Sequence, residues 1–317
     1  MAQNGNMNLF DRAILHSGSV MPIMQGVDDV AYISTHIANQ VNCTETPLLE
    51  CLRNVPAEKL VAASMITSKA KGTVLGTAFG PFLEKGFIDQ QHHINMKKGL
   101  FRKIPLMINT NMNEGSYFAG SYIANELKIA LFEHRLLPFL TPNENLALQS
   151  LYPPDSTRNI KYCNASDVLG DFFFQCPSRA LAQAYSSQHL PVFKSLFKRK
   201  WNVLSLVPNY GVPHGSDFLA WWQFSFVMLP WPFNKERELS RQMLDSIYAF
   251  GSADSFTQSI GRQWPRYDGG WKAGQRVDLD LPAEHLQVVP DSTWDRHCEF
   301  FNSITQDETR VIKYPEE

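Results

Sequence analysis

The sequence predicts an α/β protein with a mostly parallel sheet flanked by helices, because short apolar runs alternate with helical patterns along it. The clearest run, Ile104–Ile108, is short enough to be one buried strand. It is followed by a polar stretch that ends in a Glu114-Gly115 corner. Open α/β sheets keep their sites just beyond the carboxyl ends of their strands, so Glu114 is a candidate functional residue.

The first part of the chain is predicted to contain a further strand and two helices. Arg12–Leu15 reads as a short buried strand that ends in a turn at Ser17-Gly18-Ser19. In Asp28–Val41, apolar residues recur 3 or 4 positions apart, which predicts a helix with one buried face. A second helix is predicted to begin at Pro56, because proline is favoured in the first turn of a helix.

The middle of the chain is predicted to be mostly helical. Helical patterns cover Glu126–Phe132 and Glu144–Leu151. Ala165–Ser187 is predicted to be a pair of helices or one interrupted helix, and Pro177 marks either the break or a first turn. A strand is predicted to follow at Pro191–Phe197.

The last part of the chain is predicted to contain two helices and a strand. Lys235–Phe250 is the clearest amphipathic helix, and Gly251 is predicted to lie just past its end, where glycine often terminates helices. Leu286–Val289 is predicted to be the last strand. Either Asp291 or Ser292 is then predicted to cap a final helix, because both residue types accept hydrogen bonds at helix starts.

At 317 residues the chain is long enough for a large core or two domains, but it shows no internal repeat, low-complexity tract or clear linker, so residues 1–317 are predicted to be part of one domain. The chain is 44% hydrophobic and 19% charged, which is typical of a folded globular protein. Its net charge of −2 gives no reason to expect nucleic acid or an anionic membrane as a partner. No apolar run approaches the ~18 residues of a transmembrane segment. The first residues have neither the basic start nor the apolar core of a signal peptide.

A second candidate residue follows a hundred residues after the first. His214 lies in Gly211–Asp217, a tight loop bounded by glycine and proline. Histidine exchanges protons near physiological pH, and a carboxylate behind it fixes its tautomer and stabilises its charged form. In the triad of α/β-hydrolases, a serine in Gly-x-Ser-x-Gly comes first, the acid second and the histidine last. The sequence contains the last two in that order, but it contains no such serine motif.

Further stretches carry a resemblance to one family, and they comprise Asn8–Ser19, Phe79–Phe82, Gly86–Ile88, Glu236–Gly251 and Trp264–Tyr267. The first resembles the strand and turn that follow the family's nucleophile helix, and the next two resemble parts of its Phe-x-Pro hairpin. The last two resemble its long late helix and the Trp-Pro segment after that helix. Together with the glutamate and histidine loops, they resemble the type B carboxylesterases, which include the cholinesterases and several fungal lipases. The resemblance runs from about residue 8 to about residue 301 and corresponds to the C-terminal portion of the family's domain.

The resemblance implies a partial α/β-hydrolase fold whose N-terminal strands are missing. It also implies a carboxylic ester hydrolase of the serine esterase or lipase type, acting on small-molecule or lipid esters without a cofactor. Glu114 and His214 would be its acid and base, and Ser17 would hydrogen-bond the acid, although a plain turn serine is an equal alternative. The resemblance also implies a set of substrate-lining residues, and for the two aromatic residues in this set the alternative is a role in the core. That set comprises Val20, Met21, Tyr117 and Phe118.

The nucleophile and the Gly-rich oxyanion loop have no counterpart in this sequence. The resemblance therefore implies a truncated form that lacks serine-esterase activity by itself. The alternative is a non-catalytic binding or adhesion-type relative, or a pseudoenzyme. Adhesion-type members commonly lose triad residues, whereas this chain keeps the acid and base positions, which favours the enzyme lineage. The sequence indicates no particular protein partner.

The five cysteines have no spacing that suits zinc. The resemblance implies a small-loop disulfide between Cys43 and Cys51 and a long-range disulfide between Cys176 and Cys298. It leaves Cys163 as a free thiol. The alternative is five reduced cysteines in a cytosolic protein.

Two triplets, at Asn42 and Asn164, match the N-glycosylation sequon. Beside the implied disulfides, they favour a secreted, extracellular full-length parent, although this chain carries no signal peptide. No metal is expected either. His92 and His93 lack a third ligand nearby, and they are predicted to be exposed loop histidines.

Overall fold

The computed structural model describes residues 9–45, 47–70, 79–122, 137, 139–153, 163–200, 210–222, 234–252, 264–268, 274–282 and 286–307. Contacts within the chain divide it into two compact units. The sheet unit comprises Met1–Pro22, His92–Asn125 and Leu148–Gln306. The helical unit comprises Ile23–Gln91, Glu126–Ala147 and Asp307–Glu317. None of the helices in the described part of the chain combines the length and apolar character that a membrane span requires.

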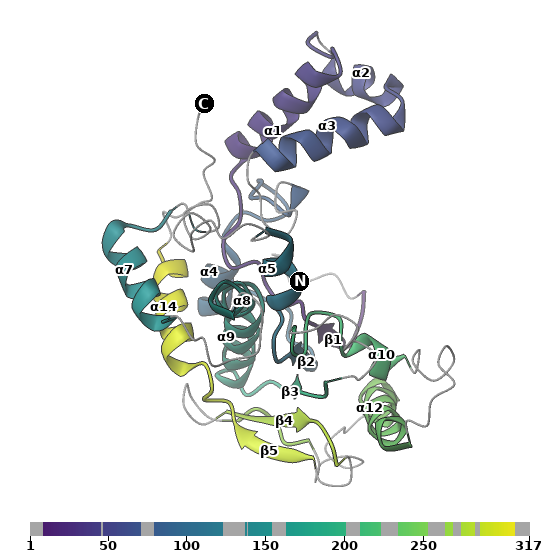
Figure 1. Cartoon of the computed structure of the whole chain (residues 1–317), viewed down its shortest axis with the longest axis vertical. Helices are drawn as coiled ribbons and strands as arrows, with labels where there is room; N and C mark the ends of the chain where they lie inside the picture. The colour runs from purple at the N-terminus through teal and green to yellow at the C-terminus, as the bar shows by residue number, and fades with distance from the viewer. Residues whose placement is uncertain are drawn as a thin grey trace. The chain divides into compact units, whose positions relative to one another are not determined.

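The sheet unit is built on a sheet with the strand order β1-β2-β3-β4-β5. The strands are β1 (Ala13–His16), β2 (Leu106–Asn111), β3 (Val192–Phe197), β4 (Gln275–Leu279) and β5 (Gln287–Pro290). The first four run parallel, and β5 is antiparallel to β4. Every residue of β2 and β3 is buried, as expected for parallel strands that are covered on both faces. The predicted α/β class with a mostly parallel sheet is confirmed (Figure 1).

Within the described ranges, the sheet unit contains α4 (His92–Lys97), α5 (Ser116–Tyr122), α8 (Cys163–Gly170), the π-helix η2 (Asp171–Gln175), α9 (Cys176–Ser186), α10 (Phe218–Trp221), α12 (Asn234–Ser252) and α14 (Asp295–Thr305). The helical unit contains α1 (Val27–Gln40), α2 (Leu48–Asn54) and α3 (Ala57–Ala70), and the boundary between the units falls within α7 (Pro142–Leu151).

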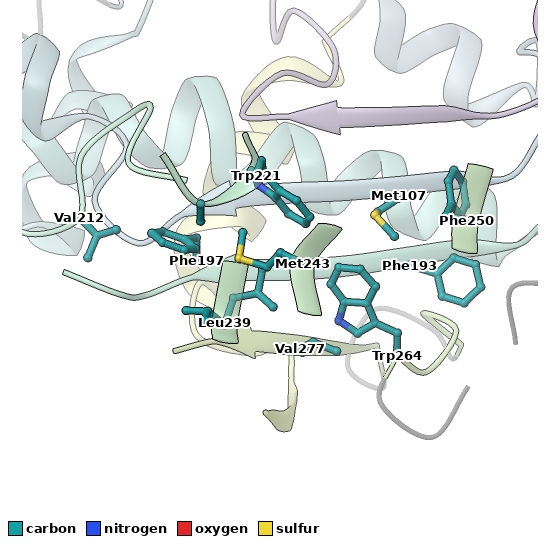
Figure 2. Packing of buried hydrophobic residues seen from close by; sticks show 12 residues of the cluster. Met107, Phe193, Phe197, Val212, Trp221, Leu239, Met243, Phe250, Trp264 and Val277 are labelled. Atoms are coloured by element: carbon teal, nitrogen blue, oxygen red, sulfur yellow. The ribbon is translucent and has the colours of Figure 1, made fainter. Parts of the chain in front are cut away.

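The two faces of the sheet are covered by different helices. Successive side chains of a strand point to opposite faces, so Leu106 and Ile108 share one face and Met107 lies on the other. The first face packs against buried residues of α9. The second face packs against α10 and α12, and Figure 2 shows Trp221 and Met243 of these helices in the same apolar cluster as Met107 and Phe197. The sheet is therefore the middle of three layers, which holds the carboxyl ends of its strands in fixed positions.

Helix boundaries differ from the predictions at the end of α12 and at the start of α14. Gly251 does not follow α12 but lies inside its last turn, because the helix continues to Ser252. The final helix, α14, begins at Asp295 after Trp294, so neither Asp291 nor Ser292 caps it. Asp291 instead accepts hydrogen bonds from two buried cations, Lys194 Nζ at 2.7 Å and Arg276 Nη1 at 2.9 Å.

Three further predictions concern helical segments. His92 and His93 are half-buried in α4, which packs against α9, so the prediction of exposed loop histidines is wrong. The predicted interrupted helix is α8, η2 and α9 in succession, with Pro177 in the first turn of α9. The helix predicted at 126–132 lies outside the described residues.

Both disulfides that the resemblance implied are present. Cys43 and Cys51 are bonded just after α1, with their Cα atoms 5.7 Å apart. Cys176 at the start of α9 is bonded to Cys298 of α14, with a Cα separation of 5.0 Å. The side chain of Cys163 lies outside the described residues.

Candidate functional site

Glu114 is held just past the carboxyl end of β2 by hydrogen bonds to one of its oxygens. The backbone N–H of Asn111, the last residue of β2, donates to Glu114 Oε1 at 2.6 Å. Ser17 Oγ donates to the same oxygen, also at 2.6 Å. The glutamate is 1% exposed, so these donors replace the water that a carboxylate requires. The second oxygen, Oε2, remains for another partner.

That partner is His214. Its Nδ1 lies 2.7 Å from Glu114 Oε2. An ionised carboxylate can only accept, so the proton of this hydrogen bond belongs on Nδ1, and Nε2 is left to exchange a proton elsewhere. Burial alone would lower the pKa of His214, but the hydrogen bond and charge of Glu114, with the charge of Asp217, raise it above its ordinary value. The structure thus brings together the two candidates that the sequence singled out.

The loop that carries His214 is shaped by its glycines and by Asn113. Gly211 and Gly215 have φ angles of +66° and +81°, which side chains other than glycine rarely adopt. Asn113 Oδ1 accepts from the Val212 N–H at 3.0 Å, and the Asn113 N–H donates to the Val212 carbonyl oxygen at 3.0 Å. Asn113 precedes Glu114 directly, so the histidine loop is fastened beside its carboxylate.

Gly115 is required by the close approach of two chain segments. A Cβ at this position would overlap the Ser166 carbonyl oxygen and the backbone nitrogen of Gly170 in α8. In return, a Cβ on Gly170 would lie 3.2 Å from the Gly115 nitrogen. The glycine of the Glu-Gly corner therefore lets α5 begin directly against α8, which fixes the turn that presents Glu114.

Ser17 occupies the supporting position that the resemblance implied. It has a φ angle of 54°, a left-handed conformation that is uncommon for serine. Its backbone N–H donates to the Asn109 carbonyl oxygen at 2.8 Å, which continues the pairing of β1 with β2. This turn directs its hydroxyl at Glu114, and the supporting role of Ser17 stays a prediction that this contact favours.

A second buried carboxylate, Asp217, lies beside the first and was given no role from the sequence. Asn109 Nδ2 donates to it at 2.7 Å, Asn111 Nδ2 at 2.9 Å and Trp221 Nε1 at 3.0 Å. His16 Nδ1 lies 3.4 Å from its Oδ2. Burial would raise the pKa of Asp217, but the hydrogen bonds of His16, Asn111 and Trp221, with the charge of His16, lower it. Two asparagines at alternate positions of a buried strand were the sequence signal for this network.

Two neighbouring phenylalanine rings lie beside His214. The ring centroid of Phe118 lies 5.1 Å from the imidazole and that of Phe174 lies 5.0 Å from it, while the two phenylalanine rings stack at 5.9 Å. Phe174, which sequence reasoning missed, belongs to the π-helix η2. Tyr117 is 63% exposed and touches Phe118 edge-on at 5.6 Å. These two neighbouring apolar rings restrict where the imidazole can rotate.

The other predicted site residues lie in varied surroundings. Val20 and Met21 line a small cavity together with Phe172 and Phe301, and their role at a substrate stays a prediction. Within the described residues, no cluster of three histidine, cysteine or carboxylate side chains is arranged to hold a metal ion.

The two sequons differ in accessibility. Asn42 is exposed just after α1 and stays a predicted glycosylation site. Asn164 is 6% exposed, and its Nδ2 donates to the Tyr152 carbonyl oxygen at 2.9 Å. That nitrogen is the atom to which a glycan would be attached, so the folded structure disfavours modification there.

The layered parallel sheet defines an α/β-hydrolase fold, with a carboxylate–histidine pair beyond its carboxyl edge. The model of the carboxylesterase family matches residues 1–301, and the chain belongs to that family. The pyrethroid hydrolase Ces2e of Rattus norvegicus is 23% identical over 291 residues, covering 83% of this chain and 47% of that protein. The solved structure of a PNB esterase is similar to this chain with a TM-score of 0.71 and 19% identity. The similarity covers 93% of this chain and 58% of the PNB esterase chain. The chain thus spans about half the length of the curated relative.

Proposed function

We propose that Glu114 and His214 are the acid and base of a serine-type carboxylic ester hydrolase whose nucleophile belongs to a segment outside this sequence. The observation that carries the proposal is the 2.7 Å contact between His214 Nδ1 and Glu114 Oε2. Membership of the carboxylesterase family supports it, and the rat relative is named a hydrolase. The proposal treats residues 1–317 as the C-terminal portion of one carboxylesterase domain, from a secreted parent.

The geometry suits general acid–base catalysis of ester cleavage. Glu114 fixes Nδ1 as the protonated nitrogen, so Nε2 accepts the proton of a serine hydroxyl as that oxygen attacks the ester carbonyl carbon. His214 then returns this proton to the leaving alcohol, and a second cycle with water releases the acid. The negative charge of Glu114 stabilises the imidazolium between these steps, in agreement with the raised pKa of His214.

The substrate class proposed is a small-molecule or lipid ester. Phe118 lies beside the imidazole and, with Tyr117, offers apolar contact area for such a substrate. The chain by itself would have no appreciable serine-esterase turnover, because it contains no Gly-x-Ser-x-Gly motif to supply the covalent step.

The test is to read the coding sequence upstream of Met1 in frame, express the extended protein and assay a p-nitrophenyl ester. The expected segment contains Gly-x-Ser-x-Gly, and the extended protein turns the ester over. His214→Asn should lower kcat/KM by about a thousandfold or more, because the general base is lost. His189→Asn is the matched control at an exposed histidine and should keep full activity.

Two outcomes would overturn the proposal. One is turnover by residues 1–317 alone that His214→Asn abolishes, since the nucleophile would then lie within this chain. The other is an upstream sequence without the serine motif together with an inactive extended protein, which would leave the non-catalytic alternative.

A further inference from the structure

A large cavity lies in the sheet unit at the edge opposite to the carboxylate–histidine pair. Its volume is about 1220 Å³. Gly99 and Lys103 in its wall precede β2, and Gln188 and His189 precede β3. Leu106 pairs with Val192 at the starts of these two strands, so the cavity opens at the amino edge of the sheet. Glu114 follows the carboxyl end of β2, and the cavity is therefore separate from the site described above.

The wall of this cavity is strongly cationic. Among the described residues, Lys97, Lys98, Lys103 and Arg266 line it, against a single lining carboxylate, Asp268. Arg266 Nε lies 3.8 Å from Asp268 Oδ1, so that carboxylate already has a cationic partner. The chain as a whole has a net charge of −2, so its composition gives no hint of this local excess. A concave wall with charges of one sign raises the local concentration of oppositely charged ligands.

Two of the cations are held in place by the wall itself. Lys103 Nζ donates to the Gly99 carbonyl oxygen at 2.7 Å and also to the side-chain oxygen of Gln188. Arg266 Nη2 donates to the His189 carbonyl oxygen at 2.9 Å. Neither interaction neutralises its cation, since carbonyl and amide oxygens carry no formal charge. Side chains that are already ordered lose less conformational entropy when a ligand binds.

The remaining wall consists largely of uncharged polar groups. Gln183, Ser186, Ser187 and Asn302 line the cavity, and α4, α9 and α14 provide its helical walls. Figure 1 shows these helices on one side of the sheet. Amide and hydroxyl groups both donate and accept hydrogen bonds, which suits a ligand that carries hydroxyl groups as well as charge. The volume is also far larger than a single phosphate or sulfate ion requires.

We propose that this cavity binds a polyol or small sugar that carries several phosphate or sulfate esters. Lys97, Lys98, Lys103 and Arg266 would pair with the ester oxyanions, and the amide and hydroxyl side chains would bind the scaffold. Phosphate and sulfate esters present the same oxyanion chemistry to such a wall, so the experiment contains one probe of each kind.

The test is isothermal titration calorimetry of the chain at low salt with inositol hexakisphosphate, sucrose octasulfate and inorganic phosphate. The two polyanions should bind saturably, and one binding more tightly identifies the preferred ester. Affinity should fall about tenfold or more between about 50 and 300 mM salt. Lys103→Gln with Arg266→Gln should weaken binding about tenfold or more, because two charge-assisted contacts are lost. Lys97→Gln, a single change at an exposed side chain, should weaken it to a smaller extent.

Lys59→Gln with Lys85→Gln is the matched control, because it removes the same charge from exposed positions in the helical unit. It should change affinity less than about twofold, since it leaves the cavity wall intact. An equal loss in this control would overturn the proposal by showing that only net charge matters. Absence of binding at low salt would overturn it as well, and so would inorganic phosphate that binds as tightly as the polyanions. Unchanged binding by the well-folded Lys97→Gln protein would also count against it.

Discussion

Asn111 and Asp217 form a reciprocal pair: Asn111 Nδ2 donates to Asp217 Oδ1 at 2.9 Å, and the Asp217 N–H donates to Asn111 Oδ1 at 3.2 Å. The backbone N–H of the same asparagine donates to Glu114. Asn111 therefore ties the end of β2 to the segment that follows His214. The position of His214 relative to Glu114 is therefore supported by this pair as well as by the loop itself.

The first prediction concerns Asp217. Asp217→Ala leaves the buried donors of Asn109 and Trp221 without their acceptor, whereas Asn111 Nδ2 keeps Ser17 Oγ at 3.1 Å. Each orphaned donor costs on the order of 1 kcal/mol or more, so a loss of about 2 kcal/mol or more in unfolding free energy is expected. Urea unfolding followed by tryptophan fluorescence measures it. Asp268→Ala, at an exposed carboxylate, should change stability by less than about 0.5 kcal/mol.

This stabilisation should depend on pH in a defined direction. The folded pKa of Asp217 is lowered, so its contribution is present above the ordinary value of 3.8 and is lost as the pH falls through the lowered value. The difference between the wild type and Asp217→Ala should therefore shrink at strongly acid pH. Equal costs for Asp217→Ala and Asp268→Ala would show that the network contributes nothing.

The second prediction concerns the titration of His214. Glu114→Gln keeps the size of the side chain but removes the charge that raises the pKa of His214 above its ordinary value of 6.5. The pKa should fall, because burial, which lowers it, is then opposed more weakly. An NMR titration of the histidine ring signals measures the change. The signals of His297, which pairs with a different carboxylate, serve as the internal reference.

The pH dependence of the stability loss in Glu114→Gln follows from the raised pKa of His214. Since the folded pKa of His214 is raised, the pair stabilises the fold fully below pH 6.5, and this contribution is lost as the pH rises through the raised value. Glu114→Gln should therefore cost more stability at acid than at alkaline pH. A His214 pKa that does not move in Glu114→Gln would show that the two side chains do not interact in solution.

The third prediction uses two glycines as a matched pair. Gly115→Ala should destabilise the fold by about 1–3 kcal/mol or more, because a Cβ there overlaps the backbone of α8. Gly251→Ala should be neutral or stabilising by up to about 1 kcal/mol, because Gly251 lies within α12 and a Cβ there meets nothing within 4 Å. Thermal unfolding of the two variants distinguishes them, and a stable Gly115→Ala protein would contradict the close packing described.

The sequence predicted the strand that precedes Glu114 and the loop of His214, because both depend on neighbouring residues alone. The Ile104–Ile108 run and the Glu-Gly corner predicted a strand with a carboxylate at its end, and β2 is found at Leu106–Asn111. The Gly- and Pro-bounded loop predicted a constrained His214, and the chain order of the two residues predicted their pairing. Each of these inferences needs only a few neighbouring residues and one rule of strand or turn chemistry.

Features that depend on strand register were not predicted. No role was predicted for Arg276 and Asp278 in β4, yet both are buried, and Asp291 and Lys198 pair with them from other segments. Asp217 likewise acquires its role only once β1 is paired with β2 and the histidine loop lies against their ends, where His16, Asn109 and Asn111 contact it. Phe174 reaches His214 through a π-helical turn, which shifts side chains away from ordinary helical spacing.

The fourth prediction concerns a second acid–histidine pair, between α14 and η2. His297 Nδ1 lies 2.8 Å from Asp171 Oδ2, and Tyr152 donates its hydroxyl to the same oxygen at 2.7 Å. Burial would lower the pKa of His297, but the hydrogen bond and charge of Asp171, the charge of Asp167 and a backbone hydrogen bond at Leu151 raise it. Burial raises the pKa of Asp171, although the hydrogen bonds of His297 and Tyr152 oppose this.

The raised pKa values of His297 and Asp171 change stability with pH in the same direction, because the folded protein holds protons that the unfolded chain releases. The contribution of His297 is fully present below pH 6.5 and is lost as the pH rises through its raised folded value. His297→Gln should therefore lower the unfolding free energy more at about pH 5.5 than at about pH 8.5. Urea unfolding at the two pH values measures the difference, and His189→Asn, at an exposed histidine, should show no such pH dependence. If His297→Gln costs the same at both pH values, the histidine contributes packing to this corner of the sheet unit and no charge.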